Sequence, residues 1–368
     1  MNIHSKSDAD AEAKRVLHLC NICGYCNGYC VVFDAAARHP LLAAGELSWL
    51  AHLCHGCGNC FYACQYAPPH SFAVNVPQTL AHLRWQEYQH RIWPRPLARL
   101  LVNSRKTTQW ALLVSAVLAL VLAMLMIPWA LFWTPAHVPG DFYRLVPLAT
   151  MTALGGLTLG WSLMVLMLSW RRFWCEIAPA PRQWSWHTLR QVLGEIIHLR
   201  QLSGGGVGCH PPDDRRFGAR RGLHQLLLLG VVLCLAATVS AAVLHHGRGQ
   251  LAPYALLSWP VVLGTVGGVM IMLAGSKLWW LKQHADPALV IAKLHAADRA
   301  LLTLLLVTAG SGLALLLGRT TAVMGLLLMV HLASVAVLFL LLPYSKFVHA
   351  GYRVLALWRQ ALETVNTK

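Results

Sequence analysis

Apolar residues form six long runs in the last two thirds of the chain, and each run reaches the length that a membrane-spanning helix needs. Such a helix requires about 20 mostly apolar residues. The runs cover residues 109–133, 146–170, 223–245, 255–276, 299–318 and 322–343. This pattern predicts a mostly α-helical chain that contains a six-helix transmembrane bundle.

The residues before the first run have a different character, because they are more polar and contain most of the cysteines. We therefore expect two domains, a polar one over residues 1–105 and a transmembrane one over residues 106–368. A long polar loop at 171–221 divides the transmembrane domain between its second and third runs.

Composition supports a membrane protein. Hydrophobic residues make up 57% of the 368 residues and charged residues only 12%, whereas soluble domains average about 25% charged residues. The formal net charge of +16 does not indicate a nucleic-acid-binding protein, because the basic residues lie at the ends of apolar runs rather than on one face.

The distribution of arginine predicts the orientation in the membrane. The segments 134–145, 246–254 and 319–321 contain one arginine each, whereas the segment 171–221 contains nine. Cytoplasmic loops carry the excess of Lys and Arg. We therefore expect both termini and the cysteine-containing domain to lie in the cytoplasm of a bacterium, with the bundle in its inner membrane.

Two runs of cysteine carry the clearest chemical signal. Both have the spacing C-x2-C-x2-C-x3-C, which is typical of bacterial ferredoxins that hold [4Fe–4S] clusters. In two-cluster ferredoxins the fourth cysteine of a run ligates the other cluster. The predicted ligand sets are therefore Cys20, Cys23, Cys26 and Cys64 for one cluster, and Cys54, Cys57, Cys60 and Cys30 for the other. A cytoplasmic ferredoxin-like helical domain is the expected fold of residues 1–105.

Zinc and disulfides are the alternative interpretations of these cysteines. Structural zinc sites use four ligands, commonly in two C-x2-C pairs, but here each run already holds four cysteines. A disulfide framework requires an oxidising compartment, and no signal peptide is recognisable. One difference from ferredoxins is that Val31 and Gln65, rather than proline, follow the fourth cysteines.

Four histidines in or near the apolar runs are candidate haem ligands, because imidazoles within a bilayer are costly and usually functional. At 1.5 Å per residue, His224 and His245 stand about 32 Å apart along a helix, and His331 and His349 about 27 Å. Because the third and sixth runs are antiparallel, His224 can face His349 and His245 can face His331. One or two b-type haems with axial histidines are therefore predicted.

Each of these histidines could instead be a hydrogen-bonded residue at the membrane interface. His246, beside His245, and His295, at the start of the fifth run, are further candidates for ligation. Near His349, the side chains of Tyr344, Lys346 and Arg353 are candidates for lining a quinone pocket.

The loop 171–221 is expected to contain an amphipathic helix. Its apolar residues recur at helical spacing, which fits either a helix on the membrane surface or a packed loop helix. They are Trp186, Leu189, Leu193, Ile196 and Leu199. Gly204–Gly206 are expected to end the helix, and the nearby Cys209 is interpreted as a structural cysteine.

Longer motifs resemble the tricarballylate (citrate) utilization protein B family, over about residues 15 to 360. They include the segment CHGCGNCFYACQYAPPH from Cys54 to His70, GGGVGC from Gly204 to Cys209, and PYSKFVH from Pro343 to His349. The family often has two adjacent histidines where this chain has His224-Gln225.

The resemblance implies an electron shuttle in the inner membrane. Its expected partner is an FAD-dependent dehydrogenase that acts on tricarballylate or a similar tricarboxylate. Electrons from the reduced flavin are expected to pass through two [4Fe–4S] clusters and haem b to the quinone pool. Because the chain has no dinucleotide-binding or P-loop motif, the flavin would belong to the partner, and no catalytic residue is assigned.

Two other functions fit the cysteines. The clusters could serve a redox sensor that reports to a membrane signalling complex, which needs no histidine pairs in the membrane. Alternatively, the chain could be a membrane anchor for an iron–sulfur enzyme, without any reduction of quinone.

Overall fold

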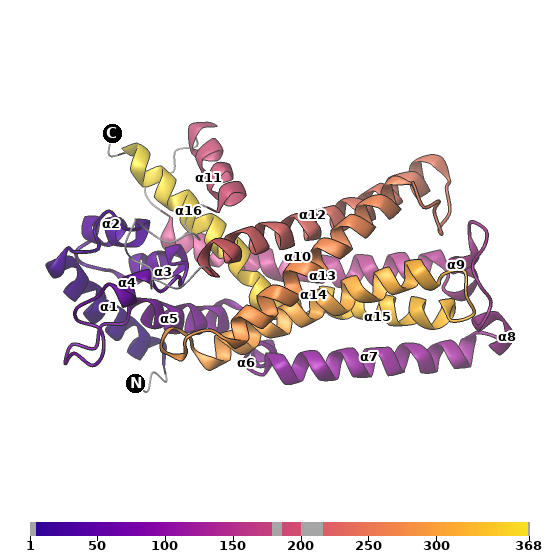
Figure 1. The fold of residues 1–368 in the computed structure, drawn as a ribbon, viewed down its shortest axis with the longest axis horizontal. Helices are drawn as coiled ribbons and strands as arrows, with labels where there is room; N and C mark the ends of the chain where they lie inside the picture. The colour runs from indigo at the N-terminus through magenta and orange to yellow at the C-terminus, as the bar shows by residue number, and fades with distance from the viewer. Residues whose placement is uncertain (1–4, 179–185, 200–215, 367–368) are drawn as a thin grey trace.

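The computed structural model describes residues 5–178, 186–199 and 216–366, and throughout these ranges every regular element is a helix. Figure 1 shows an elongated molecule with the N-terminal domain at one end and a bundle of long helices extending from it. The mostly α-helical fold class is therefore confirmed. The predicted Gly204–Gly206 turn and Cys209 lie outside the described residues.

The N-terminal domain consists of short helices around an apolar core. Trp49, Leu50 and Tyr88 are among its fully buried side chains. Its main helices are α1 (Lys6–Cys23), α2 (Val31–Arg38), α3 (Ala44–Leu53), α4 (Asn59–Tyr62) and α5 (Val76–Arg91). The Ser5 side chain accepts a hydrogen bond from the backbone N–H of Asp8 and so caps α1, which satisfies a donor that a helix start leaves free.

Six helices are long and apolar enough to cross a membrane, as the sequence predicts. They are α7 (Ser104–Met126), α10 (Leu148–Ile177), α12 (Arg216–Arg248), α13 (Trp259–Gln283), α14 (Ala292–Gly318) and α15 (Met324–Leu341), the last continued by a 3-10 turn to Tyr344. Large apolar side chains such as Leu113, Val117 and Leu125 are exposed on α7. That exposure suits contact with lipid.

The six helices have bounds that differ by up to seven residues from the predicted ones, and for two of them the difference has a clear cause or consequence. The first ends at Met126 rather than 133, because Pro128 disfavours helical geometry at Ile127, which is extended. The second continues to Ile177 rather than 170, and so carries Glu176 to the N-terminal domain. Shorter helices complete the connections: α6 (Ala98–Val102), α8 (Trp129–Phe132) and α9 (Asp141–Leu145).

Small residues allow α12 and α13 to cross closely. A Cβ added to Gly267 would lie 2.7 Å from the Gly230 carbonyl oxygen, and one added to Gly230 would lie 2.9 Å from the Gly267 carbonyl oxygen. Glycines in helix interfaces permit this approach. In contrast, Gly155 and Gly156 of α10 have no described neighbour within 4 Å of an added Cβ, so they do not mediate such a contact.

The helix expected in the loop 171–221 forms as α11 (Trp186–His198). It lies beside the C-terminal helix α16 (His349–Asn366). Val192 is buried, whereas Trp186 and Ile197 are exposed. The helix therefore packs on one side and keeps an apolar surface on another, which combines features of both predicted alternatives.

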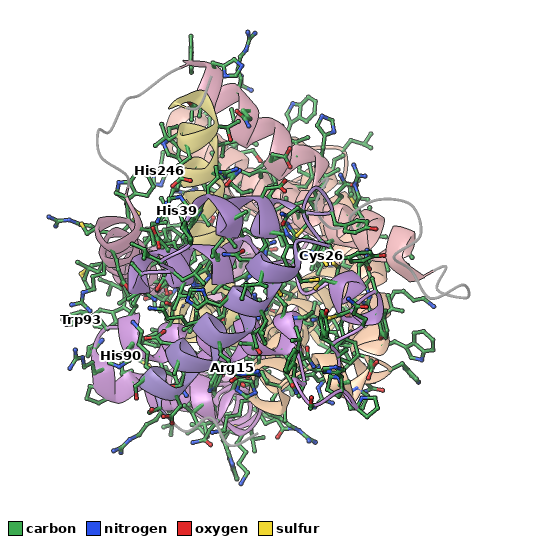
Figure 2. All side chains as sticks on the ribbon, turned by 90° about the vertical axis from the view of Figure 1, so that its left-hand side faces the viewer. Arg15, Cys26, His39, His90, Trp93 and His246 are labelled. Carbon is green, nitrogen blue, oxygen red and sulfur yellow. The ribbon has the colours of Figure 1, made fainter. Side chains whose placement is uncertain are left out.

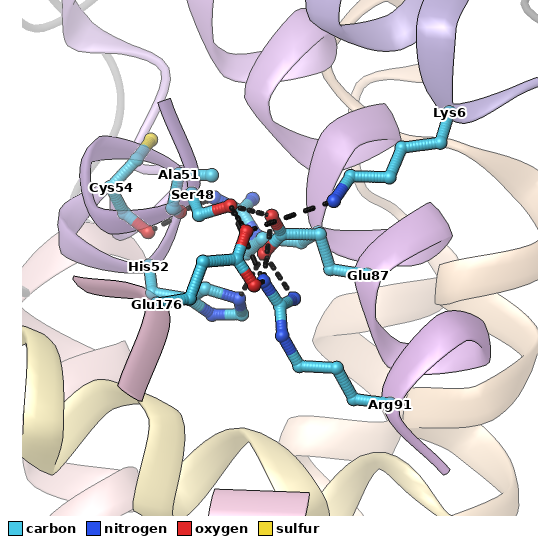
Figure 3. A network of polar contacts seen from close by, with 9 residues as sticks. Lys6, Ser48, Ala51, His52, Cys54, Glu87, Arg91 and Glu176 are labelled. Atoms are coloured by element: carbon cyan, nitrogen blue, oxygen red, sulfur yellow. Dashed lines mark hydrogen bonds and ion pairs between the residues drawn. The ribbon is translucent and has the colours of Figure 1, made fainter. Parts of the chain in front are cut away.

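The N-terminal domain is joined to the bundle through α16 and α10. The Trp49 indole N–H donates to the Ala356 carbonyl at 3.0 Å, and the Arg359 guanidinium lies 4.0 Å from the centre of the Trp49 ring. Close by, the buried Glu87 and Arg91 of α5 meet the more exposed Glu176 of α10 in the polar network of Figure 3. These contacts fix the cysteines relative to the membrane helices.

Candidate metal centre

Four cysteines line the first of two cavities in the N-terminal domain. Cys20, Cys23, Cys26 and Cys64 stand on its walls with residues such as Tyr25 and Tyr66, and we name it the outer cavity. Cys20 and Cys23 lie on the last turn of α1, which ends at Gly24 with a φ of +66°. That left-handed conformation favours glycine, and after the turn Cys26 also lines this cavity. Figure 2 labels Cys26 among the side chains of the N-terminal domain.

The second cavity, which we name the inner cavity, is lined by Cys30, Cys54, Cys57 and Cys60, with Cys26 also on its wall. Cys30 precedes α2, Cys54 follows α3, and Cys60 lies on α4. The loop between α3 and α4 bends at Gly56 and Gly58, whose φ angles are +62° and +91°. Glycine is favoured at both positions because their conformation is left-handed.

The fourth cysteine of each run therefore stands with the first three of the other run. Burial raises the pKa of Cys20 to about 12, and Cys26, Cys64 and Cys23 raise it further as neighbours. Burial likewise raises the pKa of Cys30 to about 12, with Cys54 and Cys57 among its neighbours. Such crowded thiols need a bound cation to become thiolates, and metal binding removes their protons.

At least four cysteines line each cavity. All eight are free of disulfides. In the described part of the chain, no three or more His, Cys, Asp or Glu side chains form a group that could hold one metal ion. A zinc ion requires all its ligands within about 2.0–2.3 Å, whereas a cubane is bound at four separate irons. The donor set, with four thiols available to each cavity, fits a [4Fe–4S] cluster in each.

The two cavities differ in their surroundings. Cys23 is exposed at the outer cavity, and the neighbouring Ile22 and Tyr25 are 84% and 59% exposed. At the inner cavity Cys54 is buried, and His55 lies on the wall. Burial lowers the pKa of His55 well below its usual range, and the nearby Arg353 and His224 lower it further. Of the two cavities, the inner one thus has a wall residue, His55, that is within range of the charge of His224 on α12.

His224 and His349 are within range of each other's charge. His349 begins α16, and its Nδ1 lies 2.5 Å from the carbonyl oxygen of Lys346. Burial lowers the pKa of His349 to about 3, and the charges of Lys346 and His224 act in the same direction. These two imidazoles thus lie at the same end of the bundle, and their joint ligation of haem stays a prediction.

His331 and His245 have separate described partners. The Nδ1 of His331 on α15 lies 3.1 Å from the Ser311 hydroxyl, and a Cβ added to Gly312 would lie 2.9 Å from His331 Cε1. The ring of His245 lies 6.0 Å from that of Tyr143 and 4.9 Å from that of His246. None of the contacts that the structure describes joins His245 to His331, so this pair also stays a prediction.

The three residues suggested for a quinone pocket have different partners. Lys346 lies 3.6 Å from the carboxylate of Asp298, which also binds Lys282 at 2.7 Å. The hydroxyl of Tyr344 accepts from the Trp161 indole at 3.2 Å. Arg353 is directed to the backbone of α3, where it donates to the Leu53 and Cys54 carbonyls, each at 3.2 Å.

Sequence reasoning missed two polar features near the inner cavity. Asp298 directly precedes the fifth predicted apolar run and lies in the helix α14, where a partly buried acid could have been noticed. Arg84 of α5 donates to the Ala51 carbonyl at 2.7 Å and to the Cys54 carbonyl at 3.2 Å. Nothing in the spacing of the sequence brings Arg84 and Arg353 to the same carbonyl.

Comparison with known proteins is consistent along the chain. The family described as citrate utilization protein B matches residues 102–368, and the citrate utilization protein B Fer4-like domain matches residues 13–90. A protein of Escherichia coli called citrate utilization protein B is 38% identical over 361 residues, which cover 97% of this chain and 93% of that protein. No solved structure matches the chain.

Proposed function

This chain belongs to the citrate utilization protein B family, and on that premise we propose that it is a membrane-bound electron-transfer protein. It would reoxidise the reduced flavin of a partner dehydrogenase and deliver the electrons to the quinone pool. The observation that carries the proposal is the grouping of eight cysteines around two cavities, next to a bundle of six helices able to cross a membrane.

The two ligand sets follow the two cavities. Cys20, Cys23, Cys26 and Cys64 would bind one [4Fe–4S] cluster, and Cys54, Cys57, Cys60 and Cys30 the other. Clusters of this kind transfer single electrons over a wide range of potentials. They therefore suit a chain that must divide the two electrons of a reduced flavin.

The outer cavity is the place where a partner would deliver electrons. The exposed Ile22, Cys23 and Tyr25 bring its edge to the surface, so a flavoprotein can approach there closely. The partner we propose is an FAD-dependent dehydrogenase of tricarballylate or a related tricarboxylate. The relative in Escherichia coli is named for citrate utilization, which supports a substrate of this class.

The inner cavity would pass electrons toward the membrane. His55 lies on its wall and near His224 of α12, and His224 is near His349. We assign His224 and His349 as the axial ligands of a haem b, and His245 and His331 as those of a second. Such a haem would accept one electron at a time at the depth of the bilayer.

The reduction of quinone also requires protons. Lys346 and Asp298 form a 3.6 Å ion pair close to His349, and Tyr344 lies in the adjoining turn. These side chains are our candidates for holding and delivering protons beside a bound quinone. Arg353 is withdrawn from this set, because its guanidinium is bonded to carbonyls of α3.

We place the protein in the inner membrane of a bacterium, with both termini and the N-terminal domain in the cytoplasm. The excess of arginine in the segment 171–221 supports this orientation. Reduced thiols also persist in the cytoplasm, which suits the assembly of clusters there.

The purified full-length protein tests the proposal. Non-haem iron and acid-labile sulfide should be present in about equal amounts. The dithionite-reduced protein should show the EPR signals of [4Fe–4S] clusters, and its optical spectrum should show a b-type haem band. Zinc in place of iron would refute the proposal at its base. Iron–sulfur signals without a haem band would exclude the proposed transfer of electrons from the clusters through haem b to quinone.

A reconstituted assay then separates electron transfer from the two alternatives. Reduced flavoprotein, this chain and a soluble quinone analogue should together reduce the quinone, and His331→Ala should abolish that activity. His284→Ala is the matched control, because His284 is exposed and its Nδ1 lies 3.0 Å from the Trp280 carbonyl. A wild-type protein that binds the flavoprotein without reducing quinone would indicate a membrane anchor. Quinone reduction that survives His331→Ala would contradict the haem assignment.

A further inference from the structure

Two guanidinium groups meet at the inner cavity. Arg84 from α5 and Arg353 from α16 both donate to the carbonyl oxygen of Cys54, each at 3.2 Å. Arg84 also holds the Ala51 carbonyl, and Arg353 the Leu53 carbonyl. A Cβ added to Gly56 would lie 3.8 Å from Arg84 Nη2, so this guanidinium also adjoins the loop that carries Cys57.

Neither guanidinium has a carboxylate partner among the described ion pairs. Arg84 is only 8% exposed and Arg353 is partly buried. The buried Arg91 on the same helix α5 shows the usual arrangement, because it pairs with both Glu87 and Glu176. Buried charges are normally paired, so Arg84 and Arg353 need a negative charge from another source.

The cysteine ligands of the inner cavity supply that charge. A [4Fe–4S] cluster held by four thiolates is anionic, and each one-electron reduction adds a further negative charge. The reduction potential of a cluster depends on nearby charge, hydrogen bonds and solvent exposure. Two fixed positive charges in a partly desolvated site stabilise the reduced form more than they would in water.

We propose that Arg84 and Arg353 raise the reduction potential of the cluster in the inner cavity above that of the cluster in the outer cavity. The inference rests on the proposed function and specifies the direction in which electrons flow between the two clusters. An electron that arrives at the exposed outer cavity then moves downhill toward the inner cavity and the membrane. No such pair of cations is described at the outer cavity, whose walls carry Leu19, Tyr25, Gln65 and Val74.

Redox titration of the full-length protein, followed by EPR, tests the proposal. Arg84→Gln and Arg353→Gln each remove one charge and keep a side chain that can donate a hydrogen bond. In either variant, we expect the oxidised-to-reduced ratio of one cluster to rise roughly tenfold at the wild-type midpoint, a shift of about 59 mV for a one-electron couple. The other cluster should keep its midpoint. The affected signal should be the one that Cys57→Ser also alters.

Lysine variants provide the control for charge. Arg84→Lys and Arg353→Lys keep the positive charge and lose the planar fork, so their shift should be clearly smaller than that of the glutamine variants. If the glutamine variants lose the iron of the inner cavity while the lysine variants retain it, the charge pairing is supported in another way. Equal shifts in lysine and glutamine variants, or equal shifts of both clusters, would overturn the proposal.

The result also separates this inference from the proposed function. A wild-type protein without [4Fe–4S] signals would refute the function itself. Wild-type signals that stay unchanged in both glutamine variants would refute only the role of the two arginines.

Discussion

Arg91 Nη2 lies 2.6 Å from Glu176 Oε2 and joins the last turn of α5 to the end of α10. Arg91 Nη1 also lies 3.0 Å from Glu87 Oε2, and Glu87 is held by His52 at 2.8 Å and by the Ser48 hydroxyl. Figure 3 shows these side chains turned toward one another where the N-terminal domain meets the bundle. The relative position of cysteines and membrane helices therefore depends on a buried charged network.

Replacement of Glu87 by Gln should destabilise this junction strongly. The carboxylate is fully buried, and its loss leaves Arg91 with one partner instead of two. Removing one member of a buried ion pair typically costs about 3–5 kcal/mol. Thermal unfolding of the purified protein in detergent, monitored by circular dichroism and by retained iron, measures the change.

The matched control is Glu12→Gln. Glu12 pairs with Arg15 at 2.6 Å near the surface of α1, and exposed pairs contribute about 0–1 kcal/mol. Similar losses of stability in the two variants would show that the network around Glu87 contributes no more to the free energy of unfolding than a surface ion pair does.

Glu87 should also give the protein a specific acid sensitivity. Burial alone would raise the pKa of Glu87, but Arg91, His52 and Ser48 outweigh it and hold the pKa at about 2, below the ordinary 4.5. A carboxyl with a lowered folded-state pKa contributes its full stability above the unfolded pKa. That contribution is lost as pH falls from about 4.5 to 2, by about 1.4 kcal/mol per pH unit.

The stability difference between the wild-type protein and Glu87→Gln should therefore be constant above about pH 5 and should narrow below about pH 4.5. Unfolding midpoints of both proteins between pH 6 and pH 3.5 measure it. The clusters are themselves sensitive to acid, but this sensitivity affects both proteins equally and so does not enter the difference between them. A difference that stays constant across this range would mean that Glu87 is not ionised in the folded protein.

Crossed ligation predicts which cysteine variants behave alike. Cys30 belongs to the first run in sequence but lines the inner cavity with Cys54, Cys57 and Cys60. Cys30→Ser should therefore remove the same EPR signal as Cys57→Ser, and each variant should lose about half of the iron. Cys175→Ser serves as the control, because Cys175 is an exposed free thiol on α10.

A different grouping of the cysteine variants would contradict crossed ligation. If Cys30→Ser removed the signal that Cys23→Ser removes, each run would bind its own cluster. The arrangement of the two cavities would then not represent the ligand sets.

Gly312 offers a test of His331 as a haem ligand that leaves the imidazole in place. A Cβ at Gly312 would approach His331 Cε1 to 2.9 Å, so Gly312→Ala should displace the ring. Alanine is otherwise the better helix former by about 1 kcal/mol. We expect a shifted or weakened haem band in the reduced spectrum of this variant.

Gly310→Ala is the control on the same helix. Its added Cβ would meet only the Met272 side chain, with Sδ at 3.6 Å and Cε at 3.8 Å, which are ordinary contacts. A haem spectrum that is unchanged in both variants would exclude His331 as a ligand. An equal change in both would point to a general effect on α14.

The sequence by itself determined the helical class, the six apolar helices and the two cysteine runs. These features are local, because a helix long enough to cross a bilayer needs only about 20 adjacent apolar residues. Spacings such as C-x2-C likewise lie within one loop. Even the exchange of the fourth cysteines was expected, although only by analogy with ferredoxins.

Only the tertiary structure decided which distant side chains share an environment. Arg84 and Arg353 are 269 positions apart (353 − 84) yet donate to the same Cys54 carbonyl, and Arg353 had been expected near a quinone instead. Glu176 reaches Arg91 because α10 continues beyond its apolar run. Such contacts depend on how whole helices pack against one another, and neither hydrophobic period nor motif spacing contains that information.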